Sequence, residues 1–124
     1  MTPHQKRVLC VEDDADTCAM ITSLFGLINC EVTSAGNAAE AREKIKGDKF
    51  DLYILDNWLP GASGVELCLE IREHDLTTPI MFYSGAGYET DREQALDAGA
   101  QAYLVKPSDI ASLLEIAGKL LEGK

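Results

Sequence analysis

Five short runs of four residues alternate along the chain with longer amphipathic segments, and this alternation restricts the fold more than any other feature. Four of the runs are apolar at every position, which is typical of strands that are covered on both faces in a parallel sheet. The runs occupy residues 8–11, 31–34, 52–55, 80–83 and 102–105. Because crossover connections between parallel strands are right-handed, five such units predict an open α/β sheet with helices on both faces.

Capping signals mark the starts of three of the intervening helices. In each signal a residue that caps well stands three positions before a Glu, the spacing of a capping box. The pairs are Asn37 with Glu40, Ser63 with Glu66, and Thr90 with Glu93. The helix predicted after Thr90 has a thin apolar stripe of Ala95 and Leu96, so we expect it to be held only weakly to the sheet.

Length and charge narrow the range of functions. The 124 residues suit one compact domain, and we expect residues 1–124 to form it, either as a complete protein or as a piece of a longer one. Asp and Glu number 21 against 11 Lys and Arg, so a net charge of -10 argues against direct binding to nucleic acids. No apolar stretch approaches the roughly 20 residues of a membrane span, and the N-terminus lacks the apolar core of a signal peptide. We therefore expect a cytoplasmic protein.

The four cysteines show no metal-binding or redox spacing. None of them forms a Cys-x-x-Cys pair, and two fall inside apolar runs. Free cysteine is among the most often buried residue types, so we expect reduced thiols in the core. The residues are Cys10, Cys18, Cys30 and Cys68.

Charged and polar residues follow four of the five predicted strands. They are Glu12, Asp13 and Asp14 after the first, Asp56 after the third, Ser84 after the fourth, and Lys106 after the fifth. Ligands of open parallel sheets bind beyond the carboxyl ends of the strands, so we expect these side chains to share one edge. The coincidence of four strand ends predicts a functional site there.

The chemistry of these residue types is consistent. Carboxylates that converge from two loops repel each other unless a cation lies between them, and Mg²⁺ prefers such oxygen ligands. The carboxylate of Asp56 can act as a nucleophile toward phosphorus and form an acyl phosphate. Lys106 and Ser84 would then contact the phosphoryl oxygens. Each residue alone has an ordinary explanation, as a helix cap, a turn residue or a solvated lysine, and the joint placement favours the site.

With these residues in place, the sequence resembles the receiver domain of two-component response regulators from Lys6 to Leu121. The order and spacing of four motifs carry the resemblance. The motifs are Val11-Glu12-Asp13-Asp14, Leu55-Asp56-Asn57-Trp58-Leu59-Pro60 with Gly64, Ser84-Gly85-Ala86, and Tyr103 with Lys106-Pro107. The resemblance implies a flavodoxin-like fold of five parallel strands in the order 2-1-3-4-5 with five helices, which is the order described for this family.

The resemblance also implies a set of metal ligands. Glu12 and Asp13 match the acidic pair that binds Mg²⁺ (or Mn²⁺), and Asp14 matches the variable residue after it. Asp56 matches the phosphorylated aspartate, which is also a metal ligand. The main-chain carbonyl of Trp58 matches a further protein ligand.

Three other residues take roles by the same resemblance. Lys106 matches a phosphate-binding lysine, and its bond to Pro107 would be cis. Ser84 and Tyr103 match the switch pair, in which the hydroxyl moves toward the phosphoryl group and the aromatic ring fills the space that it leaves.

The function implied is Mg²⁺-dependent transfer of a phosphoryl group to Asp56 from the phosphohistidine of a sensor histidine kinase or a histidine phosphotransfer protein. Such a domain catalyses its own phosphorylation and dephosphorylation and is not otherwise an enzyme. The output would be a changed surface on the fourth helix, fifth strand and fifth helix. An effector domain, a target protein or a second copy could read that surface.

Three alternatives are weaker. A flavin or nucleotide binder would need a Gly-, Ser- or Thr-rich loop after the first strand, and Glu12-Asp13-Asp14 gives this loop the wrong charge. An Asp-dependent phosphohydrolase would need an acid two residues after Asp56, where Trp58 stands. A degenerate receiver that acts without phosphorylation is disfavoured because all the key residues are present.

Trp58 also suggests how long the phosphorylated form lasts. Hydrolysis requires a water in line with the bond to Asp56, and neither Trp58 nor Ala86 has a carboxylate or amide that could position it. We therefore predict a comparatively long-lived phosphorylated form that apolar Trp58 shields.

Overall fold

A five-stranded parallel sheet forms the centre of the computed structural model, which describes residues 5–107 and 110–122. The strand order is β2-β1-β3-β6-β7, which is the predicted order 2-1-3-4-5 once the strands of a separate hairpin are left out of the numbering. All four neighbouring pairs are parallel, so the predicted fold class is confirmed. The strands are β1 (Lys6–Val11), β2 (Cys30–Ala35), β3 (Leu52–Leu55), β6 (Ile80–Ser84) and β7 (Ala102–Val105).

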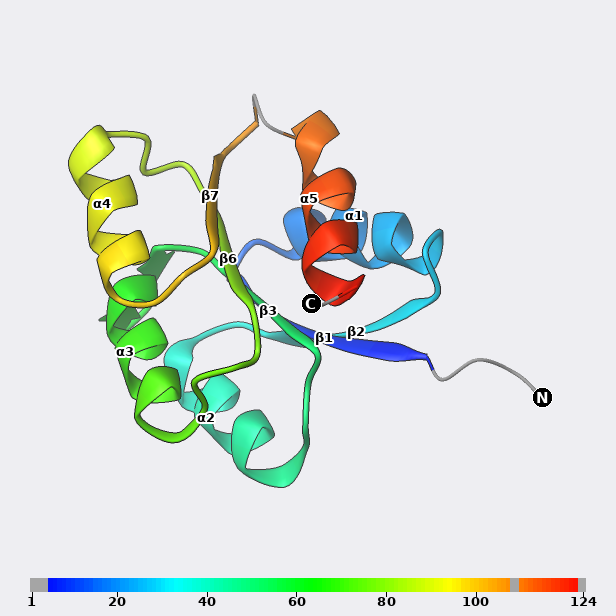
Figure 1. Ribbon diagram of the computed structural model, residues 1–124, viewed down its shortest axis with the longest axis horizontal. Coiled ribbons are helices and arrows are strands. Elements are labelled where there is room, and N and C mark those ends of the chain that lie inside the picture. The colour runs from blue at the N-terminus through cyan, green and yellow to red at the C-terminus, as the bar shows by residue number, and fades with distance from the viewer. Residues whose placement is uncertain (1–4, 108–109, 123–124) are drawn as a thin grey trace.

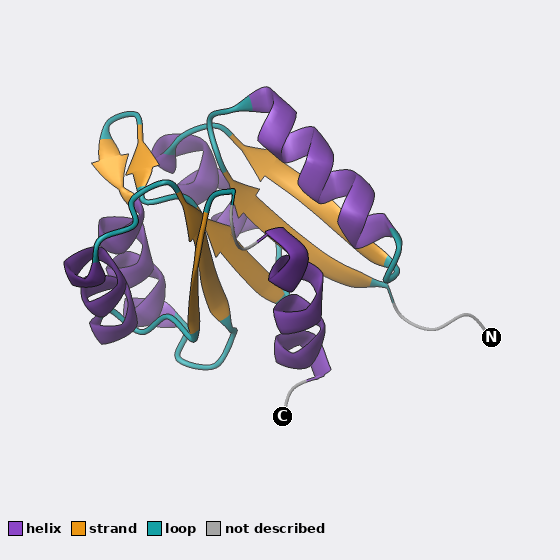
Figure 2. Ribbon diagram, turned by 90° about the horizontal axis from the view of Figure 1, so that it is seen from above, coloured by secondary structure: helices purple, strands orange, loops and turns teal. Residues whose placement is uncertain are grey.

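The helices cover both faces of the sheet (Figure 1). Helices α1 and α5 lie on one face, and α2, α3 and α4 lie on the other. Their bounds are α1 (Ala15–Gly26), α2 (Ala38–Gly47), α3 (Gly64–His74), α4 (Glu89–Asp97) and α5 (Ile110–Glu122). Figure 2 shows the sheet between these layers.

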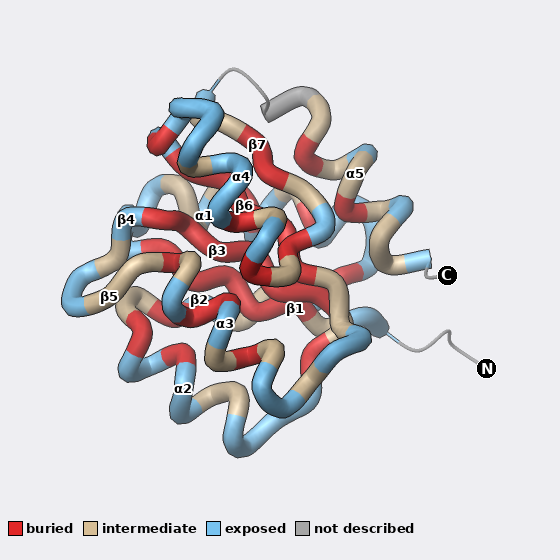
Figure 3. The backbone as a smooth tube through the Cα atoms, turned by 60° about the vertical axis from the view of Figure 1, so that its left-hand side comes forward, coloured by how far each residue is buried: buried red, intermediate tan, exposed pale blue. Residues whose placement is uncertain are grey.

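Each central strand supplies two cores because successive side chains point to opposite faces. In β1, Leu9 and Val11 pack toward α2, α3 and α4, whereas Val8 and Cys10 pack toward α1 and α5. The buried segments of the chain follow the strands through the middle of the molecule (Figure 3). The continuous apolar runs of the sequence reflect this double burial.

The capping signals are confirmed for α2 and α3 and wrong for α4. The carboxamide of Asn37 accepts a hydrogen bond from the Glu40 N–H at 2.8 Å, and Ser63 with Glu66 forms a complete capping box. Helix α4 begins at Glu89, ahead of the predicted cap at Thr90. The carboxylate of Asp91 accepts a hydrogen bond from the Tyr88 N–H at 3.1 Å, which draws the helix start back toward Tyr88.

A two-stranded antiparallel hairpin follows β3 and was not predicted. It consists of β4 (Trp58–Leu59) and β5 (Ala62–Ser63) and stands apart from the main sheet (Figure 2). The strands are too short for a periodicity signal. The Pro60-Gly61 pair is the signal that could have found the hairpin, because Gly61 adopts a φ of 83°, as the third residue of a type II turn requires.

Within the described parts of the chain, the helices all fall short of the length and apolar character needed to cross a membrane.

Candidate functional site

The register of β1 and β3 brings Glu12 and Asp56 together. Val11 pairs with Leu55, so the residues that follow them leave the sheet side by side. The Asp56 N–H donates to the Val11 carbonyl at 3.0 Å, which fixes the backbone there. The residues are only 3% and 5% exposed, respectively, so both carboxylates are buried. The strand order reverses between these two strands, which is where open α/β sheets bind ligands.

Three carboxylates converge at this edge. Glu12, Asp13 and Asp56 each offer an oxygen atom, and these atoms lie within 4.8 Å of one another. Asp13 is exposed and the other two are buried, so one side of the cluster faces solvent. Such a set of hard oxygen donors suits Mg²⁺, which keeps several waters and takes few protein ligands. The residues predicted from the sequence therefore fit the metal that the resemblance implies.

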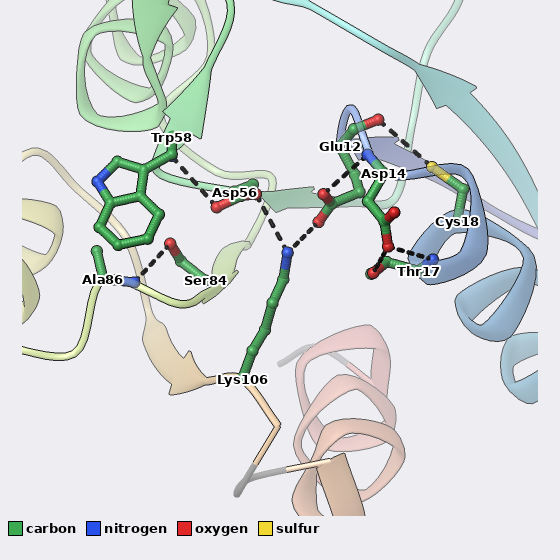
Figure 4. A network of polar contacts seen from close by, with 9 residues as sticks. All are labelled: Glu12, Asp14, Thr17, Cys18, Asp56, Trp58, Ser84, Ala86 and Lys106. Atoms are coloured by element: carbon green, nitrogen blue, oxygen red, sulfur yellow. Dashed lines mark hydrogen bonds and ion pairs between the residues drawn. The ribbon is translucent and has the colours of Figure 1, made fainter.

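Lys106 supplies the positive charge in the cluster. Its Nζ donates to Glu12 Oε1 at 2.7 Å and to Asp56 Oδ2 at 3.2 Å (Figure 4). Its backbone N–H donates to the Ser84 carbonyl at 2.9 Å, and its bond to Pro107 is cis as predicted.

The pKa values of Glu12 and Lys106 are shifted by their burial and by neighbouring charges. Burial raises the pKa of Glu12, and the charge of Asp56 raises it further against the opposing effect of Lys106. Burial alone would lower the pKa of Lys106, but its hydrogen bonds and charge interactions with the two carboxylates outweigh this and raise it. Lys106 therefore stays charged beside the cluster.

Asp14 lies outside the carboxylate cluster and caps α1. Its carboxylate accepts from the Thr17 N–H at 3.0 Å, and its own N–H donates to Glu12 Oε2 at 3.2 Å. The cap thus helps to orient Glu12.

The predicted switch residues Ser84 and Tyr103 are both buried. The Ser84 hydroxyl accepts from the Ala86 N–H at 3.2 Å (Figure 4). The Tyr103 hydroxyl donates to the Ala86 carbonyl at 2.5 Å, and its ring stacks on Phe82 with centroids 5.4 Å apart. The loop at Ala86 thus connects the two predicted switch residues, while the switch role itself stays a prediction.

Trp58 stands on the exposed side of Asp56. Its backbone N–H donates to Asp56 Oδ1 at 3.2 Å, and its side chain is turned toward Ser84 and Ala86 (Figure 4). The indole lies so close to Gly85 that a Cβ there would be 3.3 Å from the ring. The residue is 65% exposed, so the ring covers one side of the site and faces solvent with the other.

Sequence reasoning assigned no role to Asn57 and Gly64, although both support the loop of Asp56. Asn57 is buried, and its side-chain oxygen accepts from the Val65 N–H at 3.3 Å. The Gly64 N–H donates to the Asn57 carbonyl at 3.0 Å. A Cβ on Gly64 would lie 2.4 Å from the Asp56 carbonyl oxygen, so only glycine fits. No spacing rule reveals this contact, because it depends on how α3 packs under the loop.

Three of the four cysteines are buried and free, as expected, but Cys18 is only half-buried. A hydrogen bond from Cys10 is the main cause that lowers the pKa of Cys18 to about 7, against the effect of burial. A lowered pKa means that the thiolate forms at lower pH, so we expect alkylation of Cys18 by iodoacetamide to accelerate through pH 7. An ordinary thiol would have its midpoint near 8.5.

Mass-spectrometric rates from pH 5.5 to 9.5 would check this prediction. Cys18→Ser is the control and should remove the fast-reacting thiol. A midpoint at the ordinary value would contradict the expected shift.

Comparisons with known proteins agree with this geometry. A family model described as "Response regulator receiver domain" matches residues 8–117. The response regulator protein PilR of Pseudomonas aeruginosa is 32% identical over 117 residues, which are 94% of this chain and 26% of PilR. This chain spans between a quarter and a half of the length of the curated relatives that it matches.

Solved structures match along nearly the whole chain. A two-component response regulator from Clostridium difficile superposes with a TM-score of 0.89 at 27% identity, covering 95% of this chain and 97% of that one. The response regulator TrrA of Thermotoga maritima was solved in complex with Mg(2+)-BeF. It superposes with a TM-score of 0.84 at 30% identity, covering 94% of this chain and 99% of that one. Together with the family match and the buried carboxylates at the sheet edge, they show that this chain belongs to the response regulator receiver domain family of two-component systems.

Proposed function

We propose that this receiver domain accepts a phosphoryl group on Asp56 in a Mg²⁺-dependent reaction. The donor would be the phosphohistidine of a sensor histidine kinase or a histidine phosphotransfer protein. The observation that carries the proposal is the buried Asp56 carboxylate, which has an oxygen within 4.8 Å of oxygens of Glu12 and Asp13 and accepts a hydrogen bond from Lys106.

The reaction needs little more than positioning and charge. A carboxylate oxygen of Asp56 attacks phosphorus, the bond from phosphorus to the histidine nitrogen breaks, and the imidazole keeps the electron pair. Lys106 is close enough to both carboxylates to transfer one of its hydrogen bonds to a phosphoryl oxygen. The Ser84 hydroxyl would donate to another oxygen after turning from the Ala86 N–H.

The charges of the cluster support the metal assignment. Three carboxylates face one ammonium group, and this excess of negative charge favours a divalent cation. Glu12, Asp13 and Asp56 would hold Mg²⁺ (or Mn²⁺), with the main-chain carbonyl of Trp58 as a further ligand. When bound, the ion would neutralise the carboxylates and the phosphoryl oxygens. The Mg(2+)-BeF complex of TrrA supports this choice of metal.

The output proposed is a change in the surface of α4, β7 and α5, through Ser84 and Tyr103. Helix α4 supports this because Ala95 is the single buried residue between Glu89 and Asp97, so we expect the helix to move at a low cost in lost packing. An effector domain, a target protein or a second copy would read the surface. We further propose that residues 1–124 form one receiver domain that works in the cytoplasm. The domain would catalyse only its own phosphorylation and dephosphorylation, and it would bind neither nucleic acid nor a membrane.

A small acyl phosphate tests the proposal without knowledge of the kinase. Incubation of the wild-type domain with acetyl phosphate and Mg²⁺ should add one hydroxylamine-labile phosphoryl group, measured by intact mass. The same incubation with excess EDTA should add none. If a folded domain gains no phosphoryl group in the presence of Mg²⁺, the phosphoacceptor proposal is wrong. The domain would then be a phosphorylation-independent interaction module.

Trp58 should slow the loss of the phosphoryl group. Its ring covers one side of the site and carries no group that could position a water molecule. We expect Trp58→Ala to shorten the lifetime of phosphorylated Asp56 several-fold, as measured by phosphate release after removal of the donor. Tyr88→Ala, which removes another exposed aromatic residue, is the control. Faster release from the wild type would contradict the shielding role.

A further inference from the structure

A pocket of about 390 Å³ lies between helices α2 and α3. The two helices lie side by side on one face of the sheet (Figure 1). Tyr53, which lines the pocket, stands near the start of β3, whereas Asp56 follows the end of that strand. The volume falls within the range of about 300–1,000 Å³ that small-molecule sites occupy. The pocket is therefore large enough for a ligand and separate from the carboxylate cluster.

The inner surface of the pocket is apolar. Ile45 on α2 lines it together with Leu67 and Ile71 on α3 and Tyr53 on β3. Leu67, Ile71 and Tyr53 belong to the buried core of this face, and Ile45 packs against that core. Because these residues offer hydrocarbon and aromatic surface, the enclosed part of a ligand must be apolar as well.

The Tyr53 hydroxyl is a polar group within this apolar surface. Tyr53 is only 3% exposed, and its hydroxyl forms no hydrogen bond with the described part of the chain. Among the described residues, every fully buried polar side-chain atom has a hydrogen-bond partner. The hydroxyl is therefore not fully enclosed by protein and stays accessible through the pocket that the residue lines. A hydroxyl in an apolar site gains from a hydrogen-bond partner, which a ligand would supply.

An ion pair connects the two helices that form the pocket. Arg42 on α2 donates to the carboxylate oxygens of Glu70 on α3 at 2.7 and 2.9 Å. Both residues line the pocket, and their charges neutralise each other. The charge that a ligand meets is therefore set by the other residues of the rim.

The other charges of the rim favour a cation. Glu73 and Asp75 are acidic and Lys46 is basic, so negative charge is in excess when His74 is neutral. Helices α2 and α3 both end at the pocket, at Gly47 and His74, respectively. The last carbonyl groups of a helix carry partial negative charge and attract cations. Rim charges and helix ends thus act in the same direction.

We infer that this pocket binds a small organic cation in which a protonated amino group is carried on an apolar body. The apolar body packs against Leu67 and Ile71, and the amino group donates a hydrogen bond to the Tyr53 hydroxyl oxygen. Glu73 and Asp75 supply the opposite charge. The site is independent of the proposed phosphoryl transfer, because it shares no residue with the carboxylate cluster.

An NMR titration of the isotope-labelled domain with 2-phenylethylamine tests the inference. We expect saturable binding with a dissociation constant below about 1 mM, with the largest amide shifts in the residues that line the pocket. The matched probes are 2-phenylethanol, which lacks the charge, phenylacetate, which reverses it, and ethylamine, which lacks the apolar body. A binding mode without saturation, or tighter binding of phenylacetate than of the amine, would overturn the inference.

Two rim substitutions should act in opposite directions. Glu73→Gln removes a negative charge and should weaken the binding of 2-phenylethylamine, whereas Lys46→Gln removes a positive charge and should strengthen it. Glu115→Gln, on α5 at the other face of the sheet, is the matched control and should bind the amine like the wild type. Equal weakening by Glu73→Gln and Glu115→Gln would show general attraction to an acidic protein instead of a site.

Tyr53→Phe removes the hydroxyl and keeps the ring. We expect about tenfold weaker binding of the amine, since a hydrogen bond to a charged group contributes about 1.5–3 kcal/mol. The hydroxyl has no partner in the described part of the chain, so the variant should melt at or above the wild-type temperature. Wild-type affinity in a folded Tyr53→Phe would contradict the assigned role of the hydroxyl.

Discussion

Asp56→Asn is expected to take up no phosphoryl group from acetyl phosphate or from a cognate kinase, under conditions that label the wild type fully. The carboxamide has nearly the shape of the carboxylate but is not a nucleophile toward phosphorus. Its oxygen can still accept a hydrogen bond from Lys106 or the Trp58 N–H, which now bond to the two oxygens of Asp56. The substitution also removes one negative charge from beside Glu12, so the domain should melt within a few degrees of the wild type without metal.

Two measurements separate this chemical role from a structural one. Intact mass reports the phosphoryl group, and a thermal melt in EDTA reports the fold. Asp97→Asn, an exposed carboxylate on α4, is the matched control and should be labelled like the wild type. Labelling of Asp56→Asn at the wild-type rate would place the acceptor elsewhere.

Gly64→Ala should disrupt the same loop through packing alone. The added Cβ would lie 2.4 Å from the Asp56 carbonyl oxygen and 2.8 Å from the ring of Phe82. Because one of these contacts is with backbone, a side-chain rotation cannot relieve it. We expect destabilisation at the upper end of the about 1–3 kcal/mol typical of overpacked sites. The displaced Asp56 should also lose about 100-fold in labelling rate, since misplacement of a reacting group by about 1 Å has an effect of that size.

Gly118→Ala separates the steric effect from the general effect of removing a glycine. Gly118 lies inside α5 with open space around its Cβ direction, so alanine there should stabilise by about 0.5–1 kcal/mol. Urea unfolding of both variants measures the difference, and single-turnover labelling measures the rate. Gly64→Ala with wild-type stability and rate would show that α3 can move away from the loop at no cost.

The sheet could be predicted from the sequence because it depends on a local property. Residues 8–11 and 52–55 are apolar at every position, and that pattern arises wherever both faces of a strand are covered. Once the strands are parallel, their ends must share an edge, so Glu12, Asp56 and Lys106 come together without any information on side-chain packing. The carboxylate cluster was predictable for this reason.

Other features depend on contacts that the sequence does not encode at a fixed spacing. The hairpin of β4 and β5 is too short to show a period, and the start of α4 was decided by Asp91 instead of the predicted cap. The need for glycine at position 64 follows from the close approach of α3 to the Asp56 carbonyl. Each is set by tertiary packing.

The position of Trp58 gives the domain an optical property. It is the single tryptophan of the chain, and its backbone N–H is bonded to the carboxylate proposed as the acceptor. Excitation at the red edge of protein absorption selects tryptophan over tyrosine. The emission that follows therefore comes from the indole beside Asp56 and from no other residue of the chain. Binding of a cation or phosphorylation of the carboxylate would change the electric field at this fluorophore. The domain can therefore report its own occupancy in real time, without an added label or a partner.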